Sequence, residues 1–301
     1  MDRSFQMMKT LKYGTSDISS SNHDKSDQSK KDNVINVLSY NISFASQLQQ
    51  EIGSEKDFVA RCKQLERNCF DHLIEQLKYL NTIPDVAPSV IGIQEAEHPD
   101  LVNKLLDALP QLKAFHRAGV WNNSVQKYVG ALLMWDPDVL GSKKYACALN
   151  LDDGEDGRVC GIVTTEKNVT LIVAHFPWIV TKTDLEKIQA KISQFVFNPQ
   201  NIIIMADTND ANTLIHYDAP LVIKGKRLSQ NRSRAWLQHN LKTCCWHDEN
   251  SNYGHFTDTG DYILAENVEY LHVPIKVPDN KTSTLLYSDH LPVCAKVHIS
   301  L

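Results

Sequence analysis

Residues 201–209 read NIIIMADTN, an apolar run that ends in polar side chains. A short, continuous run of aliphatic residues is typical of a strand that is buried on both faces. In open α/β sheets, binding and catalytic residues lie at the edge where such strands end. This stretch therefore predicts a sheet-based fold with Asp207 and Asn209 at its functional edge.

Five other fragments join an apolar run to polar residues at one end. They are LSYN at residues 38–41, IQE at 93–95, AH at 174–175, GDYI at 260–263 and SDH at 288–290. Each fragment alone resembles any strand where it meets solvent. Together they predict Asn, Glu, His and Asp side chains at the ends of successive strands, a set suited to metal-assisted attack on a phosphate ester.

The rest of the chain alternates helical and strand-like segments. Apolar residues have helical spacing in 55–80, 101–109 and 184–195, and strand-like runs cover 34–40, 90–93, 129–135, 145–149, 159–164, 169–174, 201–206, 262–264 and 292–299. The turn-rich sequence DDGEDG at residues 152–157 separates two of these strands, as a hairpin requires. We therefore expect an α/β (α+β) fold in which two mixed β-sheets pack face to face with helices outside.

Length and composition indicate one large globular domain, because the chain has 301 residues of which 42% are hydrophobic. Residues 1–33 are rich in Ser, Asp, Lys and Asn, so we expect a disordered tail before a folded domain at 34–301. No signal-peptide core and no apolar run of membrane-spanning length is visible. The seven cysteines lack paired spacing, which suits a reducing compartment. We expect an intracellular protein of the cytoplasm or nucleus that is neither secreted nor bound to a membrane.

The net charge of −5 gives no overall attraction to nucleic acid, so any phosphate contact has to come from a local patch. One basic run without an acidic residue follows the 205–209 fragment, and it contains Lys224, Lys226, Arg227, Arg232 and Arg234. A charge run of this kind is often a solvated surface. The alternative is a loop that contacts substrate phosphates, which makes these five residues candidates for substrate binding.

A divalent cation has a suitable anchor among the strand-end residues. Mg²⁺ prefers carboxylate and amide oxygens and keeps several of its waters, so a few protein ligands suffice when a substrate phosphate completes the shell. Glu95 with Asn41 meets that need. We therefore expect Mg²⁺ as the cofactor, with Mn²⁺ as an alternative because it accepts similar ligands.

Two further pairs match the remaining needs of phosphate-ester hydrolysis. A carboxylate can orient or deprotonate the attacking water, a role that suits Asp207 with the Asn209 amide beside it. A histidine oriented by a carboxylate can stabilise charge on the phosphate, as His290 can with Asp261. The residues leave open whether Asp207 or His290 is the general base.

As an ordered set, these fragments resemble those of the endonuclease/exonuclease/phosphatase superfamily, which shares a four-layered, DNase I-like α/β sandwich. The resemblance spans nearly all of residues 34–301 and implies a role for each matching residue. The resemblance implies that Asn41, Glu95 and Asp289 bind the metal and that His175 and His290 bind the phosphate. It further implies that Asp207 and Asn209 position the attacking water and that Asp261 is the partner of His290. Tyr128, in Tyr-x-Gly-x-x-Leu, resembles a phosphate-contacting tyrosine of the apurinic endonuclease branch, and an ordinary strand aromatic is the other interpretation.

Two departures bear on the branch of the superfamily. The usual Gly-Asp-Phe/Leu-Asn motif reads ADTN at residues 206–209, and the longer signatures of the inositol phosphatase branch are absent. The sequences VLSYNI at 37–42, HFPW at 175–178 and YSDHLPV at 287–293 are most similar to the deadenylase and phosphodiesterase branch. The resemblance therefore favours a nucleic acid over an inositol phosphate as substrate.

These observations predict a Mg²⁺-dependent phosphodiesterase that acts as a nuclease on RNA or DNA. The same fold and chemistry would also suit a lipid or small-molecule phosphoester, as in sphingomyelinase relatives. A third class is a non-catalytic binding protein that has kept the fold. The sequence identifies no protein partner.

Overall fold

The computed structural model describes residues 32–43, 47, 68–98, 100–122, 127–152, 158–177, 181–209, 221–228, 244–247, 255–258, 260–271, 288 and 290–301. Within these ranges, residues 118–122, 127–129, 244–247, 255–258 and 270 are described by their backbone alone. Asp32 and Asn33, the two residues of the predicted tail that are described, already belong to the first strand.

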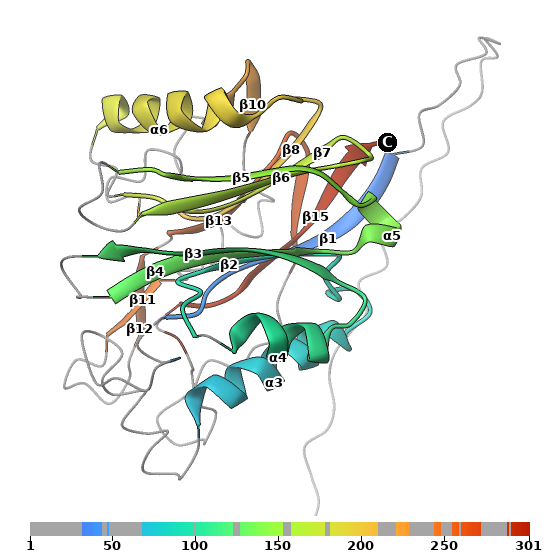
Figure 1. The fold of residues 1–301 in the computed structure, drawn as a ribbon, viewed down its shortest axis with the longest axis vertical. Helices are drawn as coiled ribbons and strands as arrows, with labels where there is room; N and C mark the ends of the chain where they lie inside the picture. Colours follow the sequence, from blue (N-terminus) through green and yellow to red (C-terminus); the bar gives the residue numbers. More distant parts are fainter. Residues whose placement is uncertain are drawn as a thin grey trace, which may run out of the picture. The chain divides into compact units, whose positions relative to one another are not determined.

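The first sheet has six strands and mixes parallel with antiparallel pairs (Figure 1). Its strands are, in order, β14 (Val268–Leu271), β15 (Val293–Ser300), β1 (Asp32–Asn41), β2 (Val90–Gln94), β4 (Lys127–Trp135) and β3 (Lys113–Asn122). β1 and β2 run parallel, whereas the other neighbours run antiparallel. The parallel pair places Asn41 directly opposite Gln94, so both strands end at the same edge.

The second sheet has five strands and contains a parallel pair of its own. Its strands are, in order, β13 (Asp261–Leu264), β8 (Asn201–Asp207), β7 (Val169–His175), β6 (Val159–Thr165) and β5 (Lys143–Asn150). His175 ends β7 opposite Asp207 at the end of β8. Because β13 is antiparallel to β8, its first residue, Asp261, also lies opposite Asp207.

The two sheets pack face to face through aliphatic side chains. Val37 and Leu133 of the first sheet and Val173 and Met205 of the second belong to one buried cluster, each at most 1% exposed. At Gly92 the sheets approach so closely that a Cβ atom would lie 2.6 Å from the Cβ of Met205. Gly92 and Met205 each lie two residues before the end of their strands, so this contact fixes the separation of the sheets behind the edge where the polar residues gather.

Helices cover the outer faces of both sheets. α3 (Cys69–Asn81) and α4 (Leu101–Ala108) share an apolar cluster with the first sheet. α6 (Lys182–Phe195) and the hairpin of β9 (Leu221–Ile223) and β10 (Lys226–Leu228) share another with the second. The resulting order of helix, sheet, sheet and helix is visible in Figure 1 and confirms the predicted four-layered sandwich.

Two of the covering helices, α3 and α6, begin at a side chain that satisfies a free backbone N–H. Asn68 accepts a hydrogen bond from the Phe70 N–H at the start of α3. Thr181 and Asp184 form a reciprocal capping box at the start of α6, which satisfies two N–H groups at once. The remaining elements are α5 (Pro137–Leu140) and a hairpin of β11 (Cys244–His247) and β12 (His255–Asp258).

Most elements match the sequence prediction, with a few differences. The sequence analysis did not expect β3, β14 or the hairpins β9–β10 and β11–β12. The predicted helix at 55–80 is observed as Cys69–Asn81, and its first part, 55–67, lies outside the described residues. Cys147, Cys160 and Cys294 are free, but Cys69 is disulfide-bonded, so the expectation of reduced cysteines throughout was wrong at this position. Among the described residues, no helix combines the length and apolarity needed to cross a membrane.

Candidate active site

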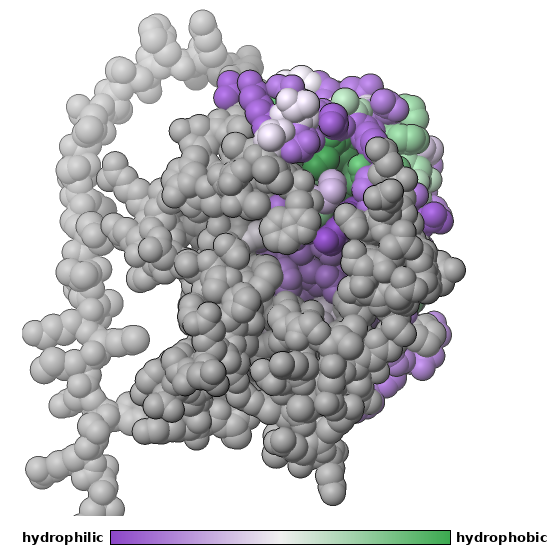
Figure 2. Space-filling view, turned by 90° about the vertical axis from the view of Figure 1, so that its left-hand side faces the viewer, coloured by the Kyte–Doolittle hydropathy of each residue, from purple (hydrophilic) through white to green (hydrophobic). Residues whose placement is uncertain are grey.

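The predicted catalytic residues converge because both parallel strand pairs end at the same side of the sandwich. Asn41 ends β1, Glu95 follows β2, His175 ends β7 and Asp207 ends β8. Figure 2 views the molecule from the left-hand side of Figure 1, where these strands end, and shows hydrophilic residues at the bottom of a hollow. The prediction that these side chains gather from separate strands agrees with this arrangement.

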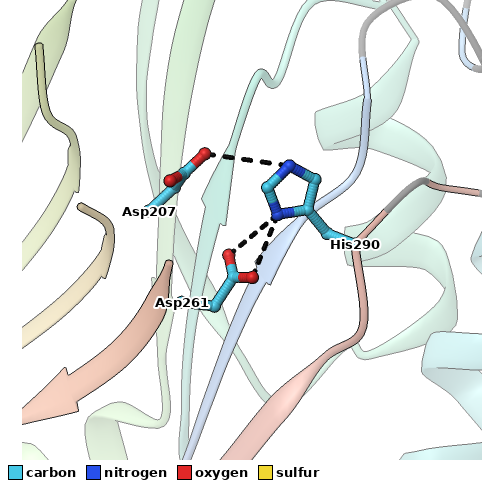
Figure 3. Close-up of side chains that lie close together, drawn as sticks. All are labelled: Asp207, Asp261 and His290. Carbon is cyan, nitrogen blue, oxygen red and sulfur yellow. Dashed lines mark hydrogen bonds and ion pairs between the residues drawn. The ribbon is translucent and has the colours of Figure 1, made fainter. Parts of the chain in front are cut away.

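His290 and Asp261 form a buried pair (Figure 3). The Nδ1 atom of His290 lies 3.1 and 3.0 Å from the two carboxylate oxygens of Asp261. A carboxylate can only accept this hydrogen bond, so it places a proton on Nδ1. The other ring nitrogen, Nε2, lies 3.8 Å from an Asp207 oxygen, which makes Nε2 the atom that faces the centre of the site.

Ser288 holds the His290 segment against the first sheet. Its hydroxyl donates to the Asn41 carbonyl at 2.8 Å and accepts from the His290 N–H at 3.1 Å. Ser288 is fully buried. The serine of the SDH fragment therefore aligns His290 with the end of β1 rather than reacting.

Asn41 connects two carboxylates. Its amide nitrogen donates to Glu95 Oε1 at 3.1 Å and to Asp207 Oδ2 at 2.9 Å. Its Oδ1 atom accepts from the Ser43 N–H at 3.1 Å. In this orientation the Asn41 amide nitrogen holds both carboxylates by donating a hydrogen bond to each. The amide would have to turn before Oδ1 could bind a metal.

Asp207 is almost completely buried, at 2% exposure, and this changes its acidity. Burial is the largest cause that raises its pKa from 3.8 to about 6, and the neighbouring Asp261 acts in the same direction. His290, the hydrogen bond from Asn41 and the Arg158 charge lower the pKa but offset only part of the rise. Asp207 is therefore ionised at neutral pH and basic enough to accept a proton near that pH.

His175 lies between Asp207 and Glu95. Its Nε2 atom is 3.4 Å from Asp207 Oδ2, and its Nδ1 atom is 4.0 Å from Glu95 Oε1. Burial lowers the pKa of His175 well below 6.5, and the charges of Arg158 and His290 lower it further. The ring is therefore neutral at pH 7 and can donate or accept one hydrogen bond at each nitrogen.

Arg158 reaches the same cluster and was missed by the sequence analysis. Its Nη1 atom lies 3.1 Å from His175 Nδ1 and also contacts Nε2 of that ring. Its Nε atom is buried and has no hydrogen-bond partner among the residues that the structure describes. Arg158 immediately precedes β6, whose start lies beside the end of β7 because the two strands are antiparallel. The sequence search considered polar residues after apolar runs, so an arginine before such a run escaped it.

Asn209 is held by the second sheet. Its backbone N–H donates to Asp207 Oδ1 at 3.1 Å, and its side-chain amide donates to the Phe176 carbonyl at 2.8 Å. Its φ angle of 44° lies in the left-handed region, as do those of Glu95 at 57° and Ser43 at 48°. Strained backbone of this kind is concentrated at functional sites, where the surrounding structure has to maintain it.

Comparison with known proteins establishes the fold. No protein-family model matches the sequence, and no curated protein matches it. Among solved structures, an endonuclease/exonuclease/phosphatase from Bacteroides vulgatus has 13% identity and a TM-score of 0.51 over 88% of this chain and 98% of that chain. ANGEL2, a 2′,3′-cyclic phosphatase, has 14% identity and a TM-score of 0.56 over 90% of this chain and 96% of its own. D. rerio TDP2, complexed with a single-strand DNA product, has 14% identity and a TM-score of 0.51 over 87% and 98%.

The chain has the endonuclease/exonuclease/phosphatase fold. The DNase I-like sandwich predicted from the ordered fragments is confirmed. In this fold the cluster described above occupies the edge at which β1, β2, β7 and β8 end.

Several predicted site residues cannot be placed in this cluster. Tyr128 lies on β4 opposite Trp121, but its side chain is outside the described residues, as are Asp289, Arg232 and Arg234. Their roles stay predictions.

The described part of the basic run lies away from the cluster. Lys224 is in the turn between β9 and β10, and its N–H donates to Ser193 in the last part of α6. Lys226 pairs with Glu266 at 3.0 Å, and Glu266 lies five residues beyond Asp261, on the order of 15 Å away in extended chain. Arg227 shares the hairpin. These three residues are not part of the catalytic cluster, and contact with a distant part of a long substrate stays a prediction.

Two groups of donors in this site could hold a divalent cation. Asp207, Asp261 and His290 offer ligand atoms within 4.8 Å of one another. However, Asp261 already binds Nδ1 of His290, and Mg²⁺ prefers oxygen ligands to an imidazole. Glu95 is more exposed than these residues, with 14% of its side chain accessible, which leaves room for the waters that Mg²⁺ keeps. Glu95 therefore fits Mg²⁺ better, and Asn41 in its observed orientation supports Glu95 as a hydrogen-bond donor.

Proposed function

We propose that this protein is a Mg²⁺-dependent phosphodiesterase whose substrate is a nucleic acid. The observation that supports this best is the convergence of the Asp261–His290 pair on Asp207, with Asn41 linking Asp207 to Glu95. Burial raises the pKa of Asp207 to about 6, so this carboxylate can exchange a proton near neutral pH, as general acid–base chemistry requires. The fold shared with known phosphoesterases supports the same reaction class.

In the proposed reaction, Glu95 would hold Mg²⁺ and Asn41 would keep Glu95 in place, and the bound ion would supply positive charge near a phosphoryl oxygen. Asp207 orients the attacking water, since it is ionised at pH 7 and has a pKa of about 6. Asp261 fixes the tautomer of His290, so that Nε2 of His290 is the atom that exchanges a proton with the water or the phosphate. The proton acceptor is Asp207 or His290, and both lie within reach of the same position.

His175 and Arg158 are proposed to bind the phosphate that is attacked. A neutral imidazole can donate one hydrogen bond to a phosphate oxygen. Arg158 adds a positive charge in the same place, and its partnerless Nε–H is available to an anionic ligand. Together they would stabilise the charge that develops on the phosphate in the transition state.

A nucleic acid is the proposed substrate for two reasons. One structural neighbour, D. rerio TDP2, is complexed with a single-strand DNA product, and another, ANGEL2, is a 2′,3′-cyclic phosphatase. The flanks of the site residues in this sequence also resemble the deadenylase and phosphodiesterase branch. Because the net charge is −5, affinity would come from the site itself rather than from the whole surface.

The deciding experiment follows the products from end-labelled single-stranded RNA and DNA oligonucleotides, and from RNA with a 2′,3′-cyclic phosphate end. We expect cleavage with Mg²⁺, none with EDTA, and a loss on the order of 10²–10⁴-fold in His290→Ala. His298→Ala is the matched control, because His298 is exposed on β15 and lies outside the site. All oligonucleotides remaining intact with Mg²⁺ or Mn²⁺ would contradict a nucleic acid substrate, and lipid and small phosphodiesters would be tested next.

A further inference from the structure

We propose that Gln47 is a positioning residue that holds Glu95, the proposed metal-binding carboxylate, together with the Asn41 amide that donates to it. This inference rests on the proposed function, since it assigns the support of the proposed metal ligand to one side chain. Gln47 is 2% exposed. Its hydrogen bonds with described residues all go to backbone groups, those of Ser43, Glu95, Glu97 and His98.

The side-chain amide of Gln47 uses its full hydrogen-bonding capacity on two loops. Its Nε2 atom donates to the Ser43 carbonyl at 3.0 Å and to the Glu95 carbonyl at 2.6 Å. Its Oε1 atom accepts from the N–H groups of Glu97 at 3.0 Å and His98 at 3.1 Å. Two donors and two acceptor positions are all that an amide has, so the group joins the loop after β1 to the loop after β2.

The two carbonyls that accept from Gln47 belong to residues with unusual backbone. Ser43 has a φ angle of 48° and Glu95 one of 57°, and L-residues other than glycine adopt this left-handed region only when their surroundings impose it. A hydrogen bond to each carbonyl fixes the orientation of the peptide plane that follows the strained residue. Gln47 therefore stabilises the conformation from which the Glu95 side chain projects.

Asn41 is held through Ser43. The Ser43 N–H donates to Asn41 Oδ1 at 3.1 Å, which directs the amide nitrogen of Asn41 towards Glu95 Oε1 and Asp207 Oδ2. Because Gln47 anchors the Ser43 carbonyl, a change at Gln47 reaches Asn41 through one residue and Glu95 directly. The proposed metal ligand Glu95 and its hydrogen-bond donor Asn41 thus depend on the same buried amide.

Two substitutions separate the functions of this amide. Gln47→Glu keeps an acceptor for the Glu97 and His98 N–H groups but loses the donor to Ser43 and Glu95. Gln47→Met has a similar length and makes none of the four hydrogen bonds. The matched control is Gln76→Met, because Gln76 accepts a hydrogen bond from the buried Tyr40 hydroxyl on the helix side of the sheet.

The test measures metal binding directly, by titrating the metal-free protein with Mn²⁺ and following free Mn²⁺ by electron paramagnetic resonance. Substituting a residue that orients a metal ligand typically lowers metal affinity 10–100-fold. We expect the Kd for Mn²⁺ to rise by about that factor in Gln47→Met and Gln47→Glu and to stay unchanged in Gln76→Met. The Mg²⁺ concentration for half-maximal cleavage should rise in parallel, and circular dichroism should show that each variant is folded.

The outcomes distinguish this inference from the proposed function. If the parent protein binds Mn²⁺ and cleaves its substrate while the Gln47 variants keep its Kd, Gln47 is only a structural residue and the inference is wrong. A melting temperature that falls without a change in Kd would lead to the same conclusion. If the parent binds no metal, the proposed function itself fails. Should Gln47→Met not fold, Gln47→Glu decides alone, because it retains the two acceptor contacts.

Discussion

Asp207→Asn should make the protein more stable while it abolishes activity. In the folded protein, burial raises the pKa of Asp207 from 3.8 to about 6. By linkage, a rise of this size means that ionisation of Asp207 costs the folded state about 3 kcal/mol at pH 8. Asparagine has nearly the same shape and carries no charge, but its single carbonyl oxygen can accept only one of the two hydrogen bonds that Asp207 receives from Asn41 and the Asn209 N–H. Losing one hydrogen bond costs about 1 kcal/mol. We therefore expect the variant to have a free energy of unfolding about 2 kcal/mol higher than the parent at pH 8.

The gain should depend on pH with a definite sign. Asp207 binds its proton more tightly in the folded than in the unfolded state. The decrease in the free energy of unfolding that its ionisation causes is therefore complete above pH 6 and becomes smaller as the pH falls. Below 3.8 the carboxyl is protonated in both states and the cost disappears. The difference between variant and parent should accordingly shrink by about 2.5 kcal/mol between pH 8 and pH 4.

Urea unfolding followed by circular dichroism at pH 8, 6 and 4 measures this difference, with EDTA present so that no cation neutralises the site. The control is Asp107→Asn on the exposed face of α4, which should change stability by less than about 0.5 kcal/mol at every pH. The reasoning is refuted if Asp207→Asn is less stable than the parent at pH 8. A stability gain that is equal at all three pH values would also refute it, because the charge would then not be its source.

Two further predictions concern the missed arginine and the contact between the sheets. Arg158→Gln should lower kcat/KM on the order of 10²-fold or more, because a positive charge at the phosphate is lost. Arg158→Lys should recover only part of the lost activity, since Lys lacks the Nε–H. Equal rates for the parent and both variants would contradict the proposed role of Arg158 in phosphate binding. Gly92→Ala should lower the free energy of unfolding in urea by about 1–3 kcal/mol, because the added Cβ would lie 2.6 Å from the Met205 side chain. An unchanged urea midpoint would show that the sheets can separate freely.

The position of the candidate site residues at strand ends could be predicted because the signal is local. Asp207 and His175 follow uninterrupted apolar runs, and the change from apolar to polar marks the sheet edge in the sequence itself. The DNase I-like fold was predicted from the resemblance of the ordered fragments to the endonuclease/exonuclease/phosphatase superfamily. Neither step required knowledge of contacts between distant residues.

The residues that escaped prediction depend on contacts that the sequence does not display. Arg158 reaches the site only because β6 runs antiparallel to β7, and strand direction is not visible in a single run. Gln47 acts on backbone groups 48 or more residues away. The edge strand β3 reads KAFHRAGVWN and has a register shift between Arg117 and Val120, so its pattern lacks a regular alternation. Long-range pairing decides all three.

The site also shows why stability and function conflict in this fold. Among the described residues, three of the five non-glycine positions with left-handed backbone are Ser43, Glu95 and Asn209, all at the active edge. Such conformations cost of order 1–3 kcal/mol each, and the buried charge of Asp207 adds a further cost. Hydrogen bonds within the site offset only part of these costs. The remainder must be offset by the apolar core between the sheets, which closes behind the site at Gly92 and Met205. A substitution that relaxes the active edge should therefore stabilise the protein, and it should do so at the expense of the geometry that the proposed reaction needs.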